Sequence, residues 1–244
     1  MARYRRVEDD DYDWTPYVSV GERRRKAEQD AAKTGPTKPV TLTGSRIANT
    51  FWGKSWCENL ERYSDYANRL PRGRTYVRSG CVIDLRIGNG IVNALVSGSC
   101  VYRVQVNVSP IPKPRWRAVC NDCVGAINSL VELLEGRFSK STLERLCREK
   151  TGMFPLPSEI TFNCSCPDSA RMCKHVAAVL YGIGARLDEK PELLFRLRNV
   201  DQEELITKAG SSLTKPKTSK VLEVDNLSEL FGIDIAEPKR KRRH

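Results

Sequence analysis

Apolar and polar side chains alternate with a period of two along three stretches between residues 74 and 108. The short turns GNG and SGS separate these stretches. Period two with glycine turns predicts an antiparallel meander that has one face on the core and one in water. Arg86 and Arg103 fall at polar positions, on the wet face. The apolar positions, predicted to face the core, are Cys81, Ile83, Leu85, Ile87, Val92, Ala94, Val96, Tyr102, Val104, Val106 and Val108.

Helical spacing dominates on both sides of this meander. Apolar residues three and four apart predict a helix over residues 51–71, which Pro71 closes, and another over residues 115–136. Shorter helices are expected after residue 140, from residue 174 and near residues 190–210. The predicted fold class is therefore α+β, an antiparallel β-meander flanked by helices.

Both ends of the chain differ in composition from this middle part. Residues 1–44 are predicted to be a flexible basic arm, in which ERRRKAEQDAAK could form a helix before TGPTKP breaks it. Such an arm is either solvated or lies on nucleic acid or a partner. Residues 45–160 form the expected α+β domain. Residues 211–244 are predicted to be a linker, a short docking segment (LSELFGIDI) and a basic tail.

Charge and cysteine content narrow the class of partner. The formal net charge is +11 and the pI is about 9.3, which favours a polyanionic partner such as DNA or another nucleic acid. The start of the chain lacks the apolar core of a secretory signal, and no apolar run approaches the roughly 20 residues of a membrane span. We therefore expect no membrane partner and a cytoplasmic location, which also allows association with the nucleoid. Cysteines there are free, metal-bound or catalytic.

The stretch CSCPDSARMCKH carries a metal-ligand pattern. Its spacing is C-x-C-x6-C-x-H, formed by Cys164, Cys166, Cys173 and His175. Period two places the first two cysteines on one face of a strand. Cys173 is expected at the lip of the next helix, with His175 in its first turn. Four thiolate and imidazole ligands predict one structural Zn²⁺, because a catalytic zinc usually keeps an open position.

This pattern resembles the SWIM zinc finger, which has CxC, a variable gap and CxH. The segments FWGKSWCENLERYSDYANRLPRGRTYVRSG, CVYRVQVNVSPIP and FNCSCPDSARMCKHVAAVLYGIGARLDEKPELLFRLRNV resemble bacterial SWIM zinc finger proteins, so the resemblance covers roughly residues 46–208. Ser169 stands where many members carry tryptophan. The resemblance implies a small ββα zinc unit, here placed in residues 161–210. It also implies binding to DNA or proteins without enzymatic activity, since such modules occur in Mutator-type transposases and beside Swi/Snf-type helicases.

Three other signals compete with this interpretation. ANTFWGKS (48–55) fits a relaxed nucleotide-loop pattern, but bulky Phe51 and Trp52 fill the positions where glycines are usual. Cys120 and Cys123 could belong to a second metal site or to the inner face of a helix. A nucleophilic triad needs a histidine base, and the interior histidine is already assigned to metal. We therefore expect no enzyme and identify no small-molecule substrate.

The sequence thus predicts a non-catalytic zinc protein that binds nucleic acid through phosphate contacts. The SWIM resemblance implies a role as accessory to a Swi/Snf-type helicase. The alternative is an adaptor whose zinc unit and C-terminal segment hold a protein partner, and an unrecognised enzyme is a third reading. The candidate nucleic-acid contacts are Arg86, Arg103, Arg171, Lys174, Lys239, Arg240, Lys241, Arg242 and Arg243.

Overall fold

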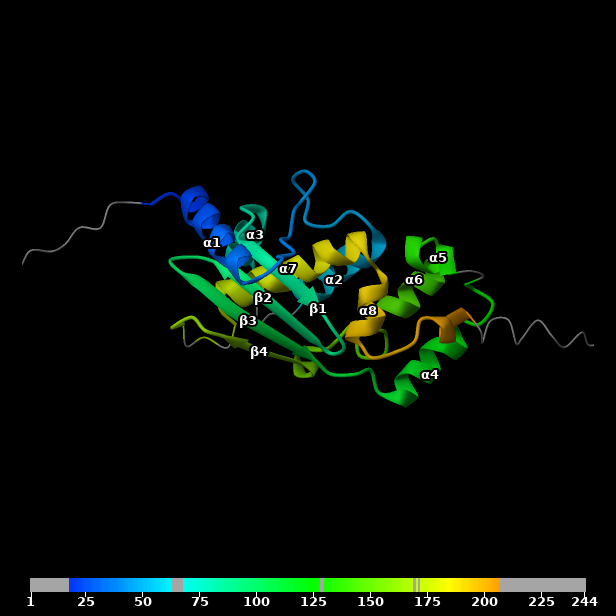
Figure 1. Ribbon diagram of the computed structural model, residues 1–244. Coiled ribbons are helices and arrows are strands. Elements are labelled where there is room, and N and C mark those ends of the chain that lie inside the picture. Colours follow the sequence, from blue (N-terminus) through cyan, green and yellow to red (C-terminus); the bar gives the residue numbers. More distant parts are fainter. Residues whose placement is uncertain (1–17, 63–67, 128–129, 169, 171, 207–244) are drawn as a thin grey trace, which may run out of the picture. The chain divides into compact units, whose positions relative to one another are not determined.

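The computed structural model describes residues 18–62, 68–127, 130–168, 170 and 172–206. Within this part, one four-stranded antiparallel sheet has the order β1-β2-β3-β4 and is accompanied by helices (Figure 1). The α+β prediction is confirmed. The docking segment, the basic tail and Arg171 lie outside the described residues. None of the described helices is long and apolar enough to cross a membrane.

The sheet consists of the predicted meander and one further strand. The bounds are β1 Val82–Ile87, β2 Ile91–Ser97, β3 Val101–Val108 and β4 Ile160–Cys164. β4 pairs with β3, with Cys164 opposite Val104. The first ligand candidate therefore ends a strand of the main sheet. The sequence suggested a ββα zinc unit. Among its described residues this unit has one strand, β4, and its helix packs in the same hydrophobic core as the meander.

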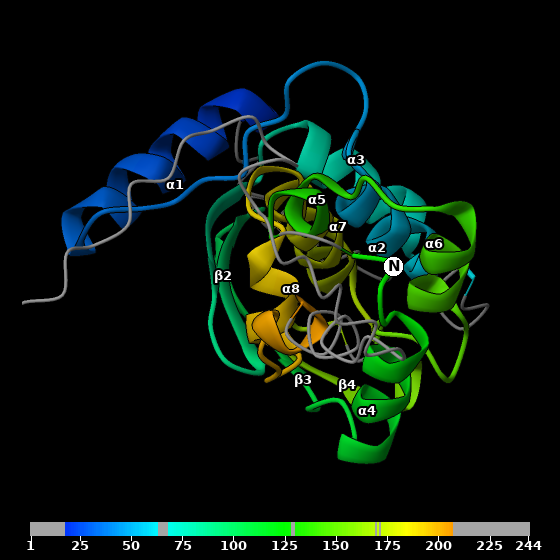
Figure 2. The same ribbon diagram turned by 90° about the vertical axis from the view of Figure 1, so that its right-hand side faces the viewer.

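The inner face of the sheet carries the core. Alternating valines of β2 and β3 are buried there, and α7 (Lys174–Glu189) lies against them with twelve buried residues. α2 (Phe51–Glu61) and α3 (Leu70–Arg78) pack against α7 on the same side of the sheet (Figure 2). The contact between α3 and α7 is close, because a Cβ atom at Gly73 would meet the Cβ of Ala177 and lie 2.6 Å from its carbonyl carbon.

α1 (Val20–Thr34) covers part of the outer face of the sheet. Its Ala27 and Ala31 pack against Ile83, and Leu95 and Val101 extend this small cluster. The register of β1 shifts between Val82 and Asp84, so Ile83 joins the outer face although simple alternation placed it inward.

The segment after α1 runs beside β1. The amide of Val40 donates to the carbonyl of Val82 (3.0 Å), and the amide of Leu85 donates to the carbonyl of Lys38 (2.9 Å). These bonds cover the edge of the sheet. Residues 18–44 therefore differ from the flexible arm predicted over 1–44, because alanines and backbone groups that looked unremarkable in sequence find partners on the sheet.

The other helices are α4 (Lys113–Asp122), α5 (Leu130–Glu135), α6 (Lys140–Cys147) and α8 (Glu192–Leu197). The helix predicted over 115–136 is thus two helices. The chain leaves α4 through Gly125, whose φ of 73° lies in the left-handed region that favours glycine. Pro71 is the second residue of α3 and does not close a longer helix. The first turn of a helix suits its fixed φ and missing amide hydrogen.

A buried charge network holds the start of β4. Glu159 precedes β4 and accepts hydrogen bonds from Arg115 (2.7 Å) and from the fully buried Arg198 (3.1 Å). Arg198 also donates to the carbonyl of Ser109 (2.6 Å). Burial alone would raise the pKa of Glu159. The hydrogen bonds from Arg115 and from the amide of Leu156, with the charge of Arg198, outweigh burial, so this pKa lies below its usual value. The network fixes the strand that leads to Cys164.

Candidate metal centre

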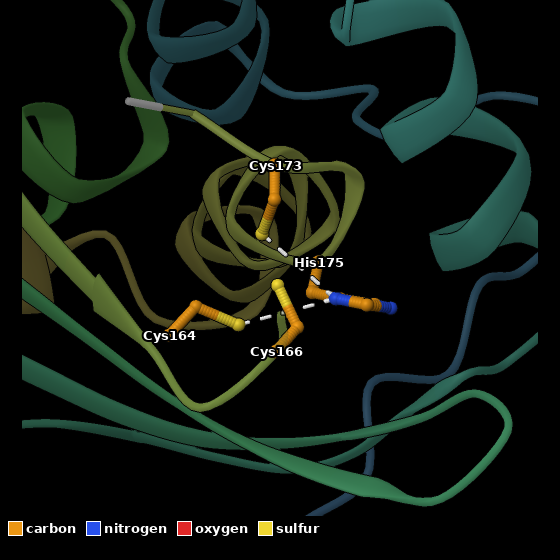
Figure 3. A group of neighbouring side chains, drawn as sticks. All are labelled: Cys164, Cys166, Cys173 and His175. Atoms are coloured by element: carbon orange, nitrogen blue, oxygen red, sulfur yellow. Dashed lines mark hydrogen bonds between the residues drawn. The ribbon is translucent and has the colours of Figure 1, made fainter. Parts of the chain in front are cut away.

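The four predicted ligands meet at one point, between the end of β4 and the beginning of α7 (Figure 3). One ligand atom from each of Cys164, Cys166, Cys173 and His175 lies within 4.8 Å of the other three. His175 Nδ1 is 3.9 Å from Cys164 Sγ and 3.8 Å from Cys173 Sγ. In a tetrahedral zinc site with bonds of about 2.0–2.3 Å, ligand atoms are roughly 3.5–3.8 Å apart. The side chains therefore fit a zinc ion.

Local structure delivers each ligand to this point. Cys164 ends β4 on the inner face, and Cys166 follows two residues later. Cys173 is the N-cap of α7, with φ −89° and ψ 170°, and its Sγ accepts a hydrogen bond from the amide of Val176 (3.4 Å). His175 lies in the first turn of α7. The prediction that Cys173 stands at the lip of the helix is confirmed.

Burial shapes the protonation of the ligands. It raises the pKa of the Cys164 and Cys173 thiols, so zinc binding must displace protons from them. Burial, and secondarily the charge of Lys174, lowers the pKa of His175 to about 4. The imidazole is therefore neutral at pH 7 and has a lone pair to offer. A cluster of three thiolates with Zn²⁺ carries a charge of about −1 by simple count.

Two aromatic rings hold the imidazole of His175. Tyr102 of β3 stacks on it with ring centroids 4.1 Å apart, and Tyr76 of α3 meets it edge-on at 5.5 Å. The turn between β2 and β3 approaches closely, because a Cβ atom at Gly98 would lie 2.7 Å from Tyr102. His175 Nε2 is buried and has no hydrogen-bond partner among the described residues. Packing against the two tyrosines therefore orients the imidazole. In most metal sites a hydrogen bond from the second ring nitrogen to a polar partner has this role.

The sequence did not identify Tyr76 and Tyr102 as part of the site. Tyr102 stood out only as an apolar position of the meander, and Tyr76 had no distinguishing pattern. Lys174 Nζ lies over the Tyr76 ring at 5.2 Å, and Arg69 Nη1 is 3.6 Å from an oxygen of Asp168. The ion pair with Asp168 neutralises Arg69, so Lys174 is the cation that the structure places next to His175.

Of the predicted nucleic-acid contacts that the structure describes, Lys174 lies beside the metal ligands, whereas Arg86 and Arg103 do not. Arg86 and Arg103 lie on the outer face of the sheet, whereas Cys164 lies on the inner face. Arg86 is engaged, since it donates to Asp84 (2.9 Å) and to the carbonyl of Pro36 (2.6 Å). Arg103 is exposed and has no ion pair with any residue that the structure describes. Lys174 is half-buried beside the centre.

The nucleotide-loop resemblance at ANTFWGKS has a different structural explanation. The amides of Asn49 and Thr50 both donate to the carboxylate of Asp188, the second at 3.0 Å, and the Thr50 hydroxyl donates to it at 2.7 Å. Trp52 is fully buried, and its indole donates to the carbonyl of Leu133 (2.9 Å). An internal carboxylate thus takes the place at the start of α2 that a phosphate would need.

Cys120 and Cys123 are part of the hydrophobic core. They are 0% and 1% exposed, and burial raises the pKa of Cys123. Among the described residues, the group of three or more potential metal ligands consists of Cys164, Cys166, Cys173 and His175. Neither Cys120 nor Cys123 belongs to it. The core interpretation of these two cysteines accounts for their position.

Comparison with known proteins gives the centre a family. Residues 161–182 match the model of the SWIM zinc finger, a range that holds all four ligands. The uncharacterized protein Rv2102 of Mycobacterium tuberculosis (strain ATCC 25618 / H37Rv) is 32% identical over 173 residues, which are 70% of this chain and 62% of that protein. No solved structure matches the chain. Residues 161–182 are a SWIM zinc finger, and its three cysteines and one histidine form a cluster suited to one structural zinc ion.

Proposed function

We propose that this protein is a non-catalytic zinc protein that binds nucleic acid through phosphate contacts. The excess of 41 basic over 30 acidic side chains carries the proposal, because a net charge of +11 attracts a polyanion. Four protein ligands leave a tetrahedral zinc without an open position, so the metal's role here is to hold β4 to α7.

Exposed basic side chains support the same proposal. Many of them have no acidic partner among the described residues, so their charge is available to phosphates. Examples on the helices and strands near the zinc finger are Lys54, Arg72, Arg78 and Arg103. Phosphate contacts release counterions, so binding should weaken steeply as salt rises. The absence of disulfides among the described cysteines fits a reducing cytoplasm, in which we place the protein.

Fluorescence anisotropy on the full zinc-loaded chain tests the proposal. The ligands are single-stranded DNA, single-stranded RNA and duplex DNA of about 16 nucleotides or base pairs, titrated at several salt concentrations. We expect the logarithm of the association constant to fall linearly with the logarithm of the salt concentration. No binding of any of the three at low salt would refute the proposal.

A tail variant of the full chain separates nucleic-acid binding by the core from the adaptor alternative. The changes are Lys239→Gln, Arg240→Gln, Lys241→Gln, Arg242→Gln and Arg243→Gln. If the variant keeps most of the affinity, residues outside the basic tail make the contacts. If all binding disappears and a helicase-type protein copurifies with the chain, the adaptor function is the better description.

A further inference from the structure

The outer face of the sheet carries a cross-strand row of hydrogen-bonding side chains, here called the amide row. It consists of Arg86, Asn93, Gln105 and Asn163, one from each strand, and each is in register with the next. The neighbouring row holds Leu95 opposite Arg103, and the Ser165 hydroxyl accepts from the amide of Arg103 (3.0 Å). Neighbouring strands are about 4.8 Å apart, so the amide row spans about 14 Å.

These rows line a hollow of about 680 Å³ on the sheet surface. α1 covers the adjoining part of the outer face (Figure 1). Its Ala27 and Ala31 pack in one cluster with Leu95, which also lines the hollow. Asp84 contributes the one negative charge of the lining, and its ion pair with Arg86 neutralises it. Arg103 leaves the hollow with a net positive charge.

The three amides stand on the face of the sheet that the alternating pattern assigns to water, and the fold does not use them. Asn93, Gln105 and Asn163 make no side-chain hydrogen bond with any residue in the described part of the chain. By contrast, Asn107 in the next row reaches Thr161 at 3.5 Å. Asparagine is disfavoured in strands, where β-branched and aromatic residues are preferred. Three unused amides in one row of a sheet therefore suggest a ligand with matching donors and acceptors.

We propose that the outer face of the sheet binds single-stranded nucleic acid, with the three carboxamides of the amide row against base edges and Arg103 against a phosphate. A carboxamide offers a donor and an acceptor side by side, and it pairs in bidentate fashion with the N6 and N7 edge of adenine. Leu95 supplies an apolar surface for a base. This inference rests on the proposed function and names the site and the form of nucleic acid.

The width of the face selects a single strand over a duplex. A major groove is about 12 Å wide and admits a helix or a two-stranded ribbon, but a four-stranded sheet about 14 Å across does not enter it. A single strand can lie across the sheet with its bases turned toward the side chains, as sheet-based RNA readers arrange it. The described lining contains no aromatic ring, so hydrogen bonds and phosphate contacts must provide the affinity.

The double variant Asn93→Thr with Gln105→Thr removes two amides and introduces residues that strands prefer. We expect its affinity for an adenine-rich single strand to fall about tenfold or more, with a smaller loss for a thymine-rich strand. Arg103→Ala should reduce the slope of log affinity against log salt by about one. Asn121→Ala removes an exposed amide of α4 and should bind like the unmodified chain. Zinc content and circular dichroism verify that each variant is folded.

Each outcome decides between the two proposals. If the double variant binds adenine-rich DNA and RNA single strands as tightly as the unmodified chain, the outer face is not the site, although the proposed function stands. If the unmodified chain binds no nucleic acid at all, the proposed function itself fails. A preference for duplex over single strands, unchanged by the variant, would also overturn the inference. Parallel DNA and RNA titrations identify which single strand is preferred.

Discussion

The replacement Cys173→Ser tests the zinc centre most directly. Cys173 is 2% exposed and caps α7 through its sulfur. Serine also caps helices well, so the change removes a thiolate ligand while it keeps a cap acceptor. Any loss of stability is therefore attributable to the metal and not to the helix start. A well-ordered site missing one of four ligands should hold little zinc.

The expected loss of stability can be estimated from the length of the chain segment that the metal orders. Fixing one backbone residue costs about 1–2 kcal/mol, so ordering the stretch from Cys164 to His175 costs on the order of 12–24 kcal/mol. Structural zinc contributes about 10–16 kcal/mol in finger peptides, which is of the same size. Met172, Cys173 and His175 are the well-buried side chains that the structure describes in this stretch, so little else offsets the cost. The later turns of α7 are buried against the sheet and do not need the metal.

We therefore expect local unfolding of the stretch, with the sheet and the rest of α7 retained. Elemental analysis should give about one zinc per unmodified chain and nearly none in the variant. Hydrogen exchange should show lost protection between Cys164 and His175, with little change in β2 and β3. Cys100→Ser, at an exposed cysteine outside the cluster, is the matched control and should keep its zinc. A metal-free variant in which this stretch keeps its protection would refute the reasoning.

Two further predictions concern the supports of the site. Glu159→Gln removes a carboxylate that is paired with the buried Arg198 and with Arg115, so urea unfolding at pH 7 should show a loss of about 3–5 kcal/mol. Because the pKa of Glu159 is held low, its stabilisation is present above its unfolded pKa of about 4.3 and is lost as pH falls through the folded value. The difference between variant and unmodified chain should therefore shrink in acid, and a constant difference would contradict the assignment. Gly73→Ala should lower the melting temperature, because the added Cβ would clash with Ala177 at an overpacking cost of about 1–3 kcal/mol. Gly21→Ala, in α1, is the control and should not lower it, because nothing lies within 4 Å of its added Cβ. Equal melting temperatures of the two variants would contradict the close packing of α3 on α7.

The sequence predicted the local features well. Alternation identified the three strands of the meander, and ligand spacing identified the four residues of the metal centre. The expected position of Cys173 at a helix lip is what the cap geometry of α7 shows. These features depend on neighbours in sequence, so period and spacing carry the information.

The remaining features depend on partners far away in sequence. Periodicity alone does not tell which strand β4 joins, or that Tyr76 and Tyr102 enclose His175. The register shift that turns Ile83 outward also goes beyond simple alternation. The apolar stripe over residues 115–136 hid the break at Gly125, and Pro71 was assigned to the end of one helix although it lies in the first turn of the next.

The carboxylate of Asp188 at the start of α2 has a consequence for recognising nucleotide sites from letters alone. It belongs to the same molecule, so it competes for the amides of Asn49 and Thr50 at an effective concentration in the millimolar range or above. A free phosphate would have to displace an anion that never diffuses away. A sequence can therefore match a nucleotide-loop pattern although an aspartate of the same chain already accepts the hydrogen bonds that a phosphate would need. Searches for such loops should check for an aspartate of this kind, which can lie far away in sequence.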